Sequence, residues 1–262
     1  MSNRRKMVGA RMPYVSRREA TRRKARSQGR YAMVTARRSF VPRALGPFSV
    51  TEKKYFDTGL YEGTISAGST WASTEVDPAT KNCLFCPVEG SDINNRVGRK
   101  VTVHKIKIRG FVQVGAQAAQ SAADEAAQIR VILFQDMQTN GAQAQGEELM
   151  ATPVLANQEL CNCVFQNTAN FGRFRVLKDI IVNGLQNANM AGSPSTVIVQ
   201  GQSQPFKFSY TFKKPVVVRF NATNGGTVAD IIDNSFHMLA HQTVSSASRK
   251  IYYQCRIVYT DA

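Results

Sequence analysis

Strict alternation of apolar and polar residues is the feature that most restricts what this chain can fold into. The aromatic residues of the segment PFKFSYTFKK recur at every second position: Phe206, Phe208, Tyr210 and Phe212. Lysine, serine and threonine occupy the positions between them. Because successive side chains of an extended strand point to opposite faces, this pattern predicts a β-strand with one buried and one exposed face.

Four other segments show the same period of two. VTVHKIKIRGFVQV places one apolar set, Ile106, Ile108, Val112 and Val114, opposite a polar set, Lys105, Lys107, Arg109 and Gln113. This strand therefore has a basic outer face. The other apolar sets are Ile129, Val131, Leu133 and Met137; Phe174, Val176, Ile180 and Val182; and Ile251, Tyr253, Cys255, Ile257 and Tyr259. Shorter strands are expected at 54–61, 216–220 and 236–241.

About eight strands with few helices predict an all-β fold, either a two-sheet sandwich or a jelly roll. Turn signals stand at Asn140-Gly141 and at Asn224-Gly225-Gly226. The Ala/Gln-rich stretch 115–128 is interpreted as an exposed loop between two strands. At 262 residues, one all-β domain is the simplest expectation and two small domains are the alternative.

Positive charge is concentrated at the start of the chain. Residues 1–43 hold 14 basic residues and one acid, Glu19, for a net charge of +13. The basic residues are Arg4, Arg5, Lys6, Arg11, Arg17, Arg18, Arg22, Arg23, Lys24, Arg26, Arg30, Arg37, Arg38 and Arg43. The rest of the chain holds the remaining 20 of 34 basic and 17 of 18 acidic residues, for a net charge of +3. A basic arm, 1–47, thus precedes a nearly neutral body, 48–262.

The arm is expected to be disordered until it meets a polyanion, because clustered like charges with few apolar residues cannot offset the entropy of ordering. Twelve of its 14 basic residues are arginine, which favours bidentate contacts to phosphate and stacking on bases. We therefore predict that the arm binds nucleic acid. A mitochondrial transit peptide, a ribosomal-protein-like tail and a nuclear localisation signal are the other interpretations.

Enzymatic motifs are not found, and an enzyme is not expected. The chain lacks a G-x-S-x-G elbow, an H-E-x-x-H pair and a phosphate-binding G-x-x-x-x-G-K-[ST] loop. His237 and His241 would lie about 13 Å apart on one strand face, which is too far to share a metal ion, so both are interpreted as polar decoration of a strand.

Cysteine and aspartate residues raise two metal hypotheses. A four-thiolate zinc site and buried thiols are both compatible with Cys83, Cys86, Cys161 and Cys163, and the tight second spacing favours buried thiols. Calcium at a subunit contact and simple solvated turns are both compatible with Asp77, Asp92, Asp136, Asp230 and Asp233, so no cofactor is assigned. Five cysteines and no export signal indicate reduced thiols in cytosol or nucleus, and no apolar run is long enough to insert in a membrane.

The order of several segments resembles the capsid proteins of small circular single-stranded DNA viruses, the group that includes circoviruses and geminiviruses. The most telling segments are RVGRK, with Arg96, Gly98 and Lys100, before the basic-faced strand, the strand that runs into DMQTNG, and the closing RIVYTD from Arg256. The resemblance extends over essentially the whole chain.

The resemblance implies one jelly-roll domain of two four-stranded antiparallel sheets. It further implies assembly of about sixty copies into a T=1 icosahedral shell, with the arm inside on single-stranded DNA and used for nuclear import, so that the protein occurs in the virion and the host nucleus. Lys105, Lys107 and Arg109 are assigned to nucleic acid with the arm. The alternatives are the capsid of a small RNA virus, a nuclear or ribosomal nucleic-acid-binding protein with a β-sandwich body, and an imported organellar hydrolase.

Overall fold

The computed structural model describes residues 52–67, 70–114, 128–151, 163–183, 187–190, 197–200, 203–243 and 249–261. The chain divides into two units, Met1–Val50 and Thr51–Ala262. The predicted basic arm belongs to the first unit and lies outside the described residues, so its assignments stay predictions. The description below concerns the second unit, the body.

The described part of the body consists almost entirely of β-strands. The strands are β1 (Lys53–Asp57), β2 (Tyr61–Thr64), β3 (Ser66–Ala67), β4 (Lys100–Val114), β5 (Gln128–Asp136), β6 (Phe174–Asn183), β7 (Asn187–Met190), β8 (Val197–Gln200), β9 (Ser203–Phe220), β10 (Ile231–Asp233), β11 (Ser235–Gln242) and β12 (Arg249–Asp261). The helical turns are α3 (Gly146–Leu149), η3 (Thr168–Asn170) and η4 (Val228–Asp230). No helix in these described segments is long and apolar enough to cross a membrane.

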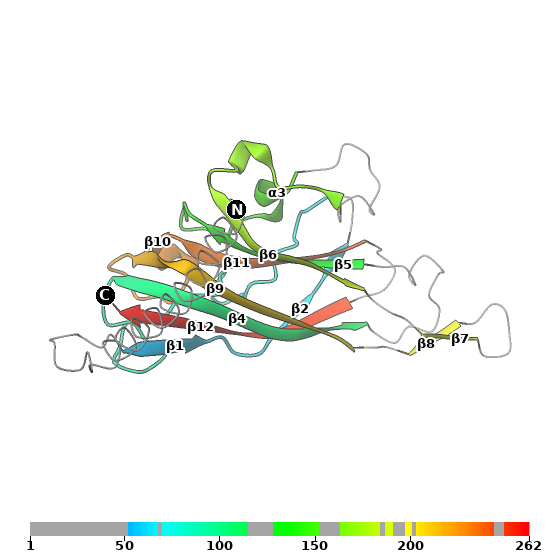
Figure 1. Ribbon diagram of the computed structural model, residues 1–262, viewed down its shortest axis with the longest axis horizontal. Helices are drawn as coiled ribbons and strands as arrows, with labels where there is room; N and C mark the ends of the chain where they lie inside the picture. Colours follow the sequence, from blue (N-terminus) through cyan, green and yellow to red (C-terminus); the bar gives the residue numbers. More distant parts are fainter. Residues whose placement is uncertain are drawn as a thin grey trace, which may run out of the picture. The chain divides into compact units, whose positions relative to one another are not determined.

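Two sheets lie one above the other (Figure 1). The six-stranded sheet has the order β1-β12-β4-β9-β10, with β2 also paired to β12, and the four-stranded sheet has the order β3-β11-β5-β6. Strands β7 and β8 form a separate hairpin. All the pairings are antiparallel except that of β3 with β11. The predicted all-β fold is therefore confirmed, with more strands than the expected two sets of four.

The main core lies between the two sheets and is built by the predicted alternation. Phe206, Phe208 and Phe212 of β9 are buried, whereas Lys207, Ser209 and Thr211 between them are exposed. The apolar set predicted in β12 is completely buried at all five positions. Both predicted glycine turns are also present, since Gly141 and Gly226 adopt the positive φ angles of 70° and 72° that favour glycine.

A β-bulge corrects one prediction. The segments expected as two strands, PFKFSYTFKK (205–214) and 216–220, form the single strand β9. Its register with β4 jumps from Val103 opposite Val216 to Lys105 opposite Thr211. The skipped stretch contains Pro215, which has no backbone N–H to donate to a ladder, and a bulge is one of the few places where a sheet accommodates proline.

The two central strands of the four-stranded sheet, β11 and β5, are buried on both faces, which alternation did not predict. Every residue of β11 is buried, as are both faces of β5. The outer face of this sheet is covered by a second apolar cluster, in which Trp71, Leu149 and Phe174 pack on Ile132, Phe134 and Leu239. The expected core residue Met137 is wrong: it follows the end of β5 and is 36% exposed.

The connection 63–95 contributes to both sheets. Glu75 pairs with Leu239 of β11, and the amide of Leu84 donates to the carbonyl of Phe236 at 2.8 Å. The single strand expected at 54–61 is instead two strands, β1 and β2, which are separated by residues 58–60 and both pair with β12. Phe85 then enters the main core against Phe56, with ring centroids 5.4 Å apart.

Arg96, part of the RVGRK segment, has a structural role. Its side chain is only 1% exposed and donates hydrogen bonds to the carbonyl oxygens of Pro87, Gly98 and Thr223 at 3.0 to 3.2 Å. The guanidinium also lies over the ring of Phe220, 4.7 Å from its centroid. Arg96 therefore joins two connections that are distant in sequence.

We predict that Arg96→Ala lowers the free energy of unfolding by about 2–4 kcal/mol, because three carbonyl groups lose their donor and a cavity remains. Arg99→Ala is the matched control, since Arg99 is exposed, and it should change stability by less than about 0.5 kcal/mol. Urea unfolding followed by circular dichroism measures both. Equal effects of the two substitutions would refute the structural role of Arg96.

Candidate nucleic-acid interface

The outer face of the six-stranded sheet carries the predicted basic residues of the body. Lys107 and Arg109 of β4 are exposed and Lys105 is half-buried, whereas Ile106 and Ile108 between them are completely buried. The predicted two-faced character of this strand is confirmed.

A bulge at His104 determines where this basic face begins. Val101 and Val103 are buried at odd positions, but Ile106 and Ile108 are buried at even positions. The register of β4 with β12 shifts by one residue at this point, since Val103 lies opposite Tyr259 and Lys105 lies opposite Val258. Because a shift of one residue exchanges the two faces of a strand, the bulge turns the odd-numbered residues from Lys105 onward to the outside.

Sequence reasoning missed two cations that complete the cluster. Lys107 lies opposite Arg256 of β12, and Arg109 lies opposite Lys207 of β9. Lys207 did appear on the polar side of its strand in the sequence pattern. Only the pairing of β4 with both neighbours, however, brings these side chains beside Lys107 and Arg109.

Most of this cluster lacks a carboxylate partner. Arg256 forms a bidentate pair with Asp57, with distances of 2.6 and 2.7 Å, and this hydrogen bonding raises the pKa of the guanidinium above its ordinary value. Within the described residues, no ion pair includes Lys105, Lys107, Arg109 or Lys207. Since like charges on neighbouring strands repel each other, an anion bound here would relieve that repulsion.

Two adjoining hollows lie between these side chains. One, of about 220 Å³, is lined by Lys107, Arg109, Gln254 and Arg256. The other, of about 260 Å³, is lined by Lys105, Lys107, Arg109, Lys207, Phe208 and Ser209. Exposed Lys and Arg side chains around a hollow suit the phosphate oxygens of a nucleic acid, which position the ligand without reading its sequence.

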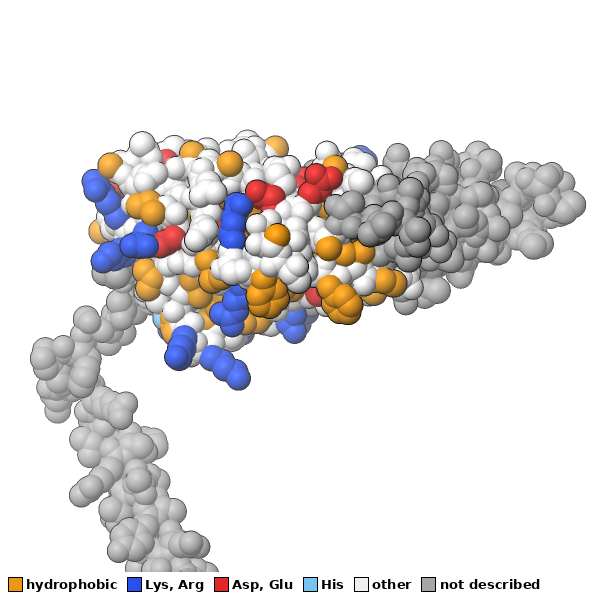
Figure 2. Space-filling view, turned by 90° about the horizontal axis from the view of Figure 1, so that it is seen from above, with side chains coloured by type: hydrophobic (Ala, Val, Ile, Leu, Met, Phe, Trp, Pro, Cys, Tyr) orange, Lys and Arg blue, Asp and Glu red, His pale blue; other side chains and the backbone are white. Residues whose placement is uncertain are grey.

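A different surface has a mixed character. Figure 2, a view from above Figure 1, shows hydrophobic and acidic side chains interspersed with Lys and Arg, which gather at one end and along the lower edge. Individual exposed apolar residues elsewhere on the body include Phe165 and Phe171, 87% and 65% exposed. The basic cluster on the six-stranded sheet is therefore more uniform in charge than the surface shown in Figure 2.

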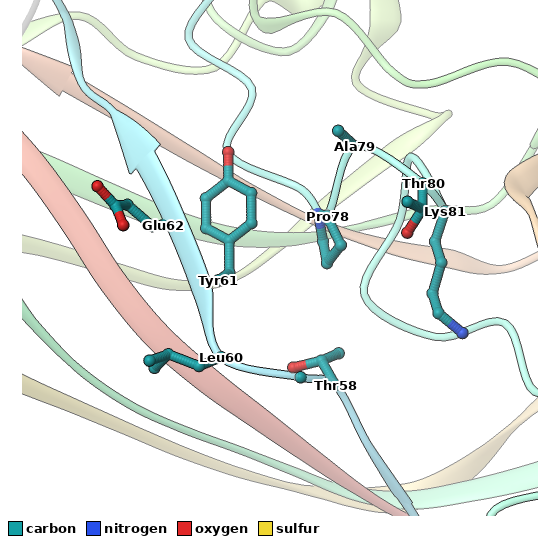
Figure 3. Close-up of a pocket in the computed structure, with 9 residues that line it drawn as sticks. Thr58, Leu60, Tyr61, Glu62, Pro78, Ala79, Thr80 and Lys81 are labelled. Carbon is teal, nitrogen blue, oxygen red and sulfur yellow. The ribbon is translucent and has the colours of Figure 1, made fainter.

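A pocket of about 360 Å³ between the β1–β2 connection and the turn 78–81 offers little chemistry (Figure 3). Thr58 accepts a hydrogen bond from the Cys255 amide at 2.9 Å, and the Lys81 amine lies over the ring of Phe56, 4.8 Å from its centroid. Burial, with a smaller effect of the Asp77 charge, raises the pKa of Tyr61. The polar groups on this pocket thus already serve the fold.

His237 and His241 are not surface decoration, and that prediction is wrong. Both are completely buried. The Nδ1 atom of His237 lies 2.7 Å from Asp77 Oδ2, and its Nε2 atom lies 2.8 Å from Ser235 Oγ. Thr139 donates its hydroxyl proton to Ser235 Oγ at 2.7 Å. Ser235 is then free to donate to Nε2, which places the imidazole proton on Nδ1, facing Asp77.

The hydrogen-bonded series Ser235–His237–Asp77 connects the same three residue types as the Ser-His-Asp triad of hydrolases. Unlike such a triad, it is buried in the core. Ser235 and His237 are 0% exposed and Asp77 is 4% exposed. Asp77 also accepts the amide of Met238 at 2.9 Å. The series therefore fastens the segment around Asp77 to β11 and satisfies its buried polar groups.

The structure tests part of the zinc and calcium hypotheses for the cysteine and aspartate residues. Asp136 is completely buried and paired with Arg173 at 2.8 Å, so it is not a solvated turn residue. Buried thiols are confirmed for Cys83 and Cys86, whereas Cys163 is exposed and Cys161 lies outside the described residues. In the part of the chain that the structure describes, no three His, Cys, Asp or Glu residues lie close enough together to hold a metal ion.

Burial affects the pKa of two further groups, the thiol of Cys255 and the carboxyl group of Asp230. Burial raises the pKa of the Cys255 thiol well above its ordinary value. For Asp230 burial alone would raise the pKa, but hydrogen bonds from Thr223 and from the amides of Thr227, Gly226 and Gly225 outweigh it and lower the pKa. Asp230 is therefore a loop-fixing carboxylate.

Comparisons with known proteins give no family. No family model and no curated protein matches the chain. Among solved structures, dimeric latent PorU from Porphyromonas gingivalis is 9% identical with a TM-score of 0.28, over 82% of this chain and only 14% of that chain.

Two further structures are viral, and the similarity is weak. Cocksfoot mottle virus is 10% identical with a TM-score of 0.24, over 80% of this chain and 96% of that chain. The VP1 pentamer of Human Polyomavirus 7 is 9% identical with a TM-score of 0.23, over 82% and 98%. At such TM-scores, none of the three assigns a specific fold or function to this chain.

We predict that Lys107→Gln with Arg109→Gln reduces the salt dependence of nucleic-acid binding by the full-length protein. Losing two phosphate contacts should lower the slope of log affinity against log salt by about 1.5. Fluorescence anisotropy at several salt concentrations measures this slope. The matched control is Arg175→Gln with Lys178→Gln, two exposed cations of β6 in the other sheet. Equal slopes for the two double variants would argue against the basic face.

Proposed function

We propose that this chain is a viral capsid protein, which self-assembles into an icosahedral shell and packages a circular single-stranded DNA genome through its basic N-terminal arm. The observation that carries the proposal is the division of charge between a +13 arm and a body of +3. A polycation suits a packaged genome, and a nearly neutral body suits close association of many copies, because weakly charged subunits repel each other less.

The strand order supports a jelly roll as the fold of the shell domain. The antiparallel pairs β1 with β12, β4 with β9, and β5 with β6 are nested one inside the next, and the antiparallel bridge of Glu75 with Leu239 of β11 fits between the first two, whereas β3 pairs with β11 in parallel. Such nesting describes one long hairpin, folded over so that β12 meets β4 and β11 meets β5. Jelly rolls of this kind occur in viral capsid domains. The additional strands β2 and β10 lie outside the nest.

The charge of the arms suits a packaged genome, which carries one negative charge per nucleotide. The simplest icosahedral shell has about sixty copies, which would bring about 780 positive charges to the interior. Binding by such arms depends on phosphate and is sensitive to salt, with little reading of sequence. Nuclear import through the arm, a place in the virion and the host nucleus, and the absence of enzymatic activity belong to the same proposal.

A nuclear or ribosomal nucleic-acid-binding protein is the second candidate, favoured by one observation. The basic face of the six-stranded sheet is exposed on a single copy and needs no assembly to bind nucleic acid. The two functions differ in particle size. Light scattering after size-exclusion chromatography and nuclease treatment should give uniform particles of megadalton mass for a capsid. A monomer or dimer at every salt concentration and pH would favour the second candidate.

We predict that replacing Arg17, Arg18, Arg22 and Arg23 by Ala leaves the body folded and reduces the nucleic acid in purified particles. Four charges are lost from each arm while the described strands are untouched. The ultraviolet absorbance ratio of the particles reports the nucleic-acid content. The control replaces four exposed cations of the body, Arg175, Lys178, Lys213 and Lys214, by Gln. Unchanged nucleic-acid content in the arm variant would contradict packaging by the arm.

A further inference from the structure

An exposed aromatic pair stands on the sheet beside the basic cluster. The rings of Phe111 and Tyr252 are stacked, with centroids 4.9 Å apart and an interplanar angle of 18°. Phe111 is 38% exposed and Tyr252 is half-buried. Neither ring takes part in the core between the sheets, so their positions do not follow from folding alone.

The pair lies on the same face as the cations. Between Lys105 and Gln113 the register of β4 with both neighbours is regular, so Phe111 follows Arg109 on the outer side at a distance of about 7 Å along the strand. Tyr252 is opposite Phe111 on β12, and Gln254, which lines one of the two hollows, is opposite Arg109. Aromatic surface and unpaired positive charge are therefore neighbours.

The Phe111 ring keeps exposed surface beyond its contact with Tyr252. Tyr252 on β12 covers one side, and the residue opposite Phe111 on the other neighbour, β9, is the exposed Pro205. Tyr252 is held from its own far side, since its hydroxyl lies 3.2 Å from Glu62 Oε1, which also pairs with Lys250. The pair is thus a supported, partly exposed platform, next to β9 and two positions along the sheet from Lys207.

We propose that the outer face of the six-stranded sheet is a binding site for single-stranded nucleic acid, in which an unpaired base stacks on Phe111 and the adjacent phosphates contact Arg109, Lys107 and Lys207. The inference rests on the proposed function in taking nucleic acid as the ligand. It adds a site on the folded body that is separate from the arm and that selects single strands.

The chemistry of the platform favours single strands over duplexes. A base in a duplex is stacked on both sides and its faces are closed to a protein ring, whereas bases of a single strand stack readily on aromatic side chains. A groove of positive charge beside a stacking ring is the usual arrangement of proteins that bind single strands without sequence preference.

Charge repulsion argues against two copies of the protein associating through this face. Lys105, Lys107, Arg109 and Lys207 have no acidic partner among the described ion pairs, and a second identical face would bring the same charges against them. The acids nearby, Asp57 and Glu62, are already paired with Arg256 and Lys250. A polyanion is therefore the complementary occupant.

Photocrosslinking of the full-length protein tests the inference. The probe is a single-stranded oligonucleotide that contains 5-bromodeoxyuridine, and the cross-linked peptides are identified by mass spectrometry. We expect adducts in the body on the peptides that contain Phe111 or Tyr252, in addition to those on the arm. A duplex of the same sequence and length should give adducts on the arm but not on these peptides.

Substitution of the platform should remove the body adducts. Phe111→Leu keeps apolar bulk but removes the stacking surface, and it should lower their yield about tenfold. Phe171→Leu, at an aromatic residue that is 65% exposed and belongs to the turn before β6, is the matched control and should leave the yield unchanged. The adduct map of the unaltered protein decides the question even if Phe111→Leu does not fold.

The failure of this inference can be distinguished from failure of the capsid function. Adducts confined to the arm, in particles that protect nucleic acid from nuclease, would overturn the sheet site and leave the capsid proposal intact. Adducts on Phe111 or Tyr252 in a protein that never forms particles would support the sheet site and overturn the capsid. Equal adducts from duplex and single strand would also overturn the proposed selectivity.

Discussion

Burial of alternate side chains between the two sheets is the constraint on which the rest of the body depends. The even-numbered residues Ile106 and Ile108 of β4 are completely buried in it. Because a strand has only two faces, this burial forces Lys105, Lys107 and Arg109 to the outside. The bulge at His104 lets the same strand bury Val101 and Val103 at its other end. The basic face, where we propose that nucleic acid binds, is therefore a consequence of which residues of β4 the core buries.

The two sheets treat their outer faces differently. The outside of the four-stranded sheet is covered by the cluster around Trp71 and Leu149 and by the chain of hydrogen bonds from Asp77 to Thr139. The outer side of the six-stranded sheet, at β4 and its two neighbours, instead presents Lys107, Arg109 and Lys207. The four-stranded sheet thus lies at the centre of a three-layer region, whereas the six-stranded sheet separates the core from a positively charged surface.

Much of the fold could be predicted from period-two patterns, and the exceptions have physical causes. The patterns gave the buried faces of β9 and β12 correctly, because each of these strands has one core face and one solvent face. They failed for His237, since β11 is buried on both sides and a polar residue there needs partners such as Asp77 and Ser235 that are distant in sequence. No local pattern contains those partners.

The site was only half visible in the sequence for a similar reason. A single strand showed Lys105, Lys107 and Arg109 on one face, but Arg256 and Tyr252 join them only through the register of β12. The aromatic pair was missed because Phe111 and Tyr252 are far apart in the chain and neither is remarkable in its own segment. Cross-strand proximity is information that the strand pairing adds.

The outward-facing positions of β4 have a consequence for how such a protein can change over generations. The side chains of Lys107 and Arg109 are exposed to solvent. The buried residues Ile106 and Ile108, which pack in the core, alternate with them in the same strand. Substitutions at the outer positions can therefore change the charge of this surface without disturbing the packing of Ile106 and Ile108 between the sheets. The exposed and the buried positions of one strand can therefore evolve separately, the first under selection for surface chemistry and the second under selection for packing.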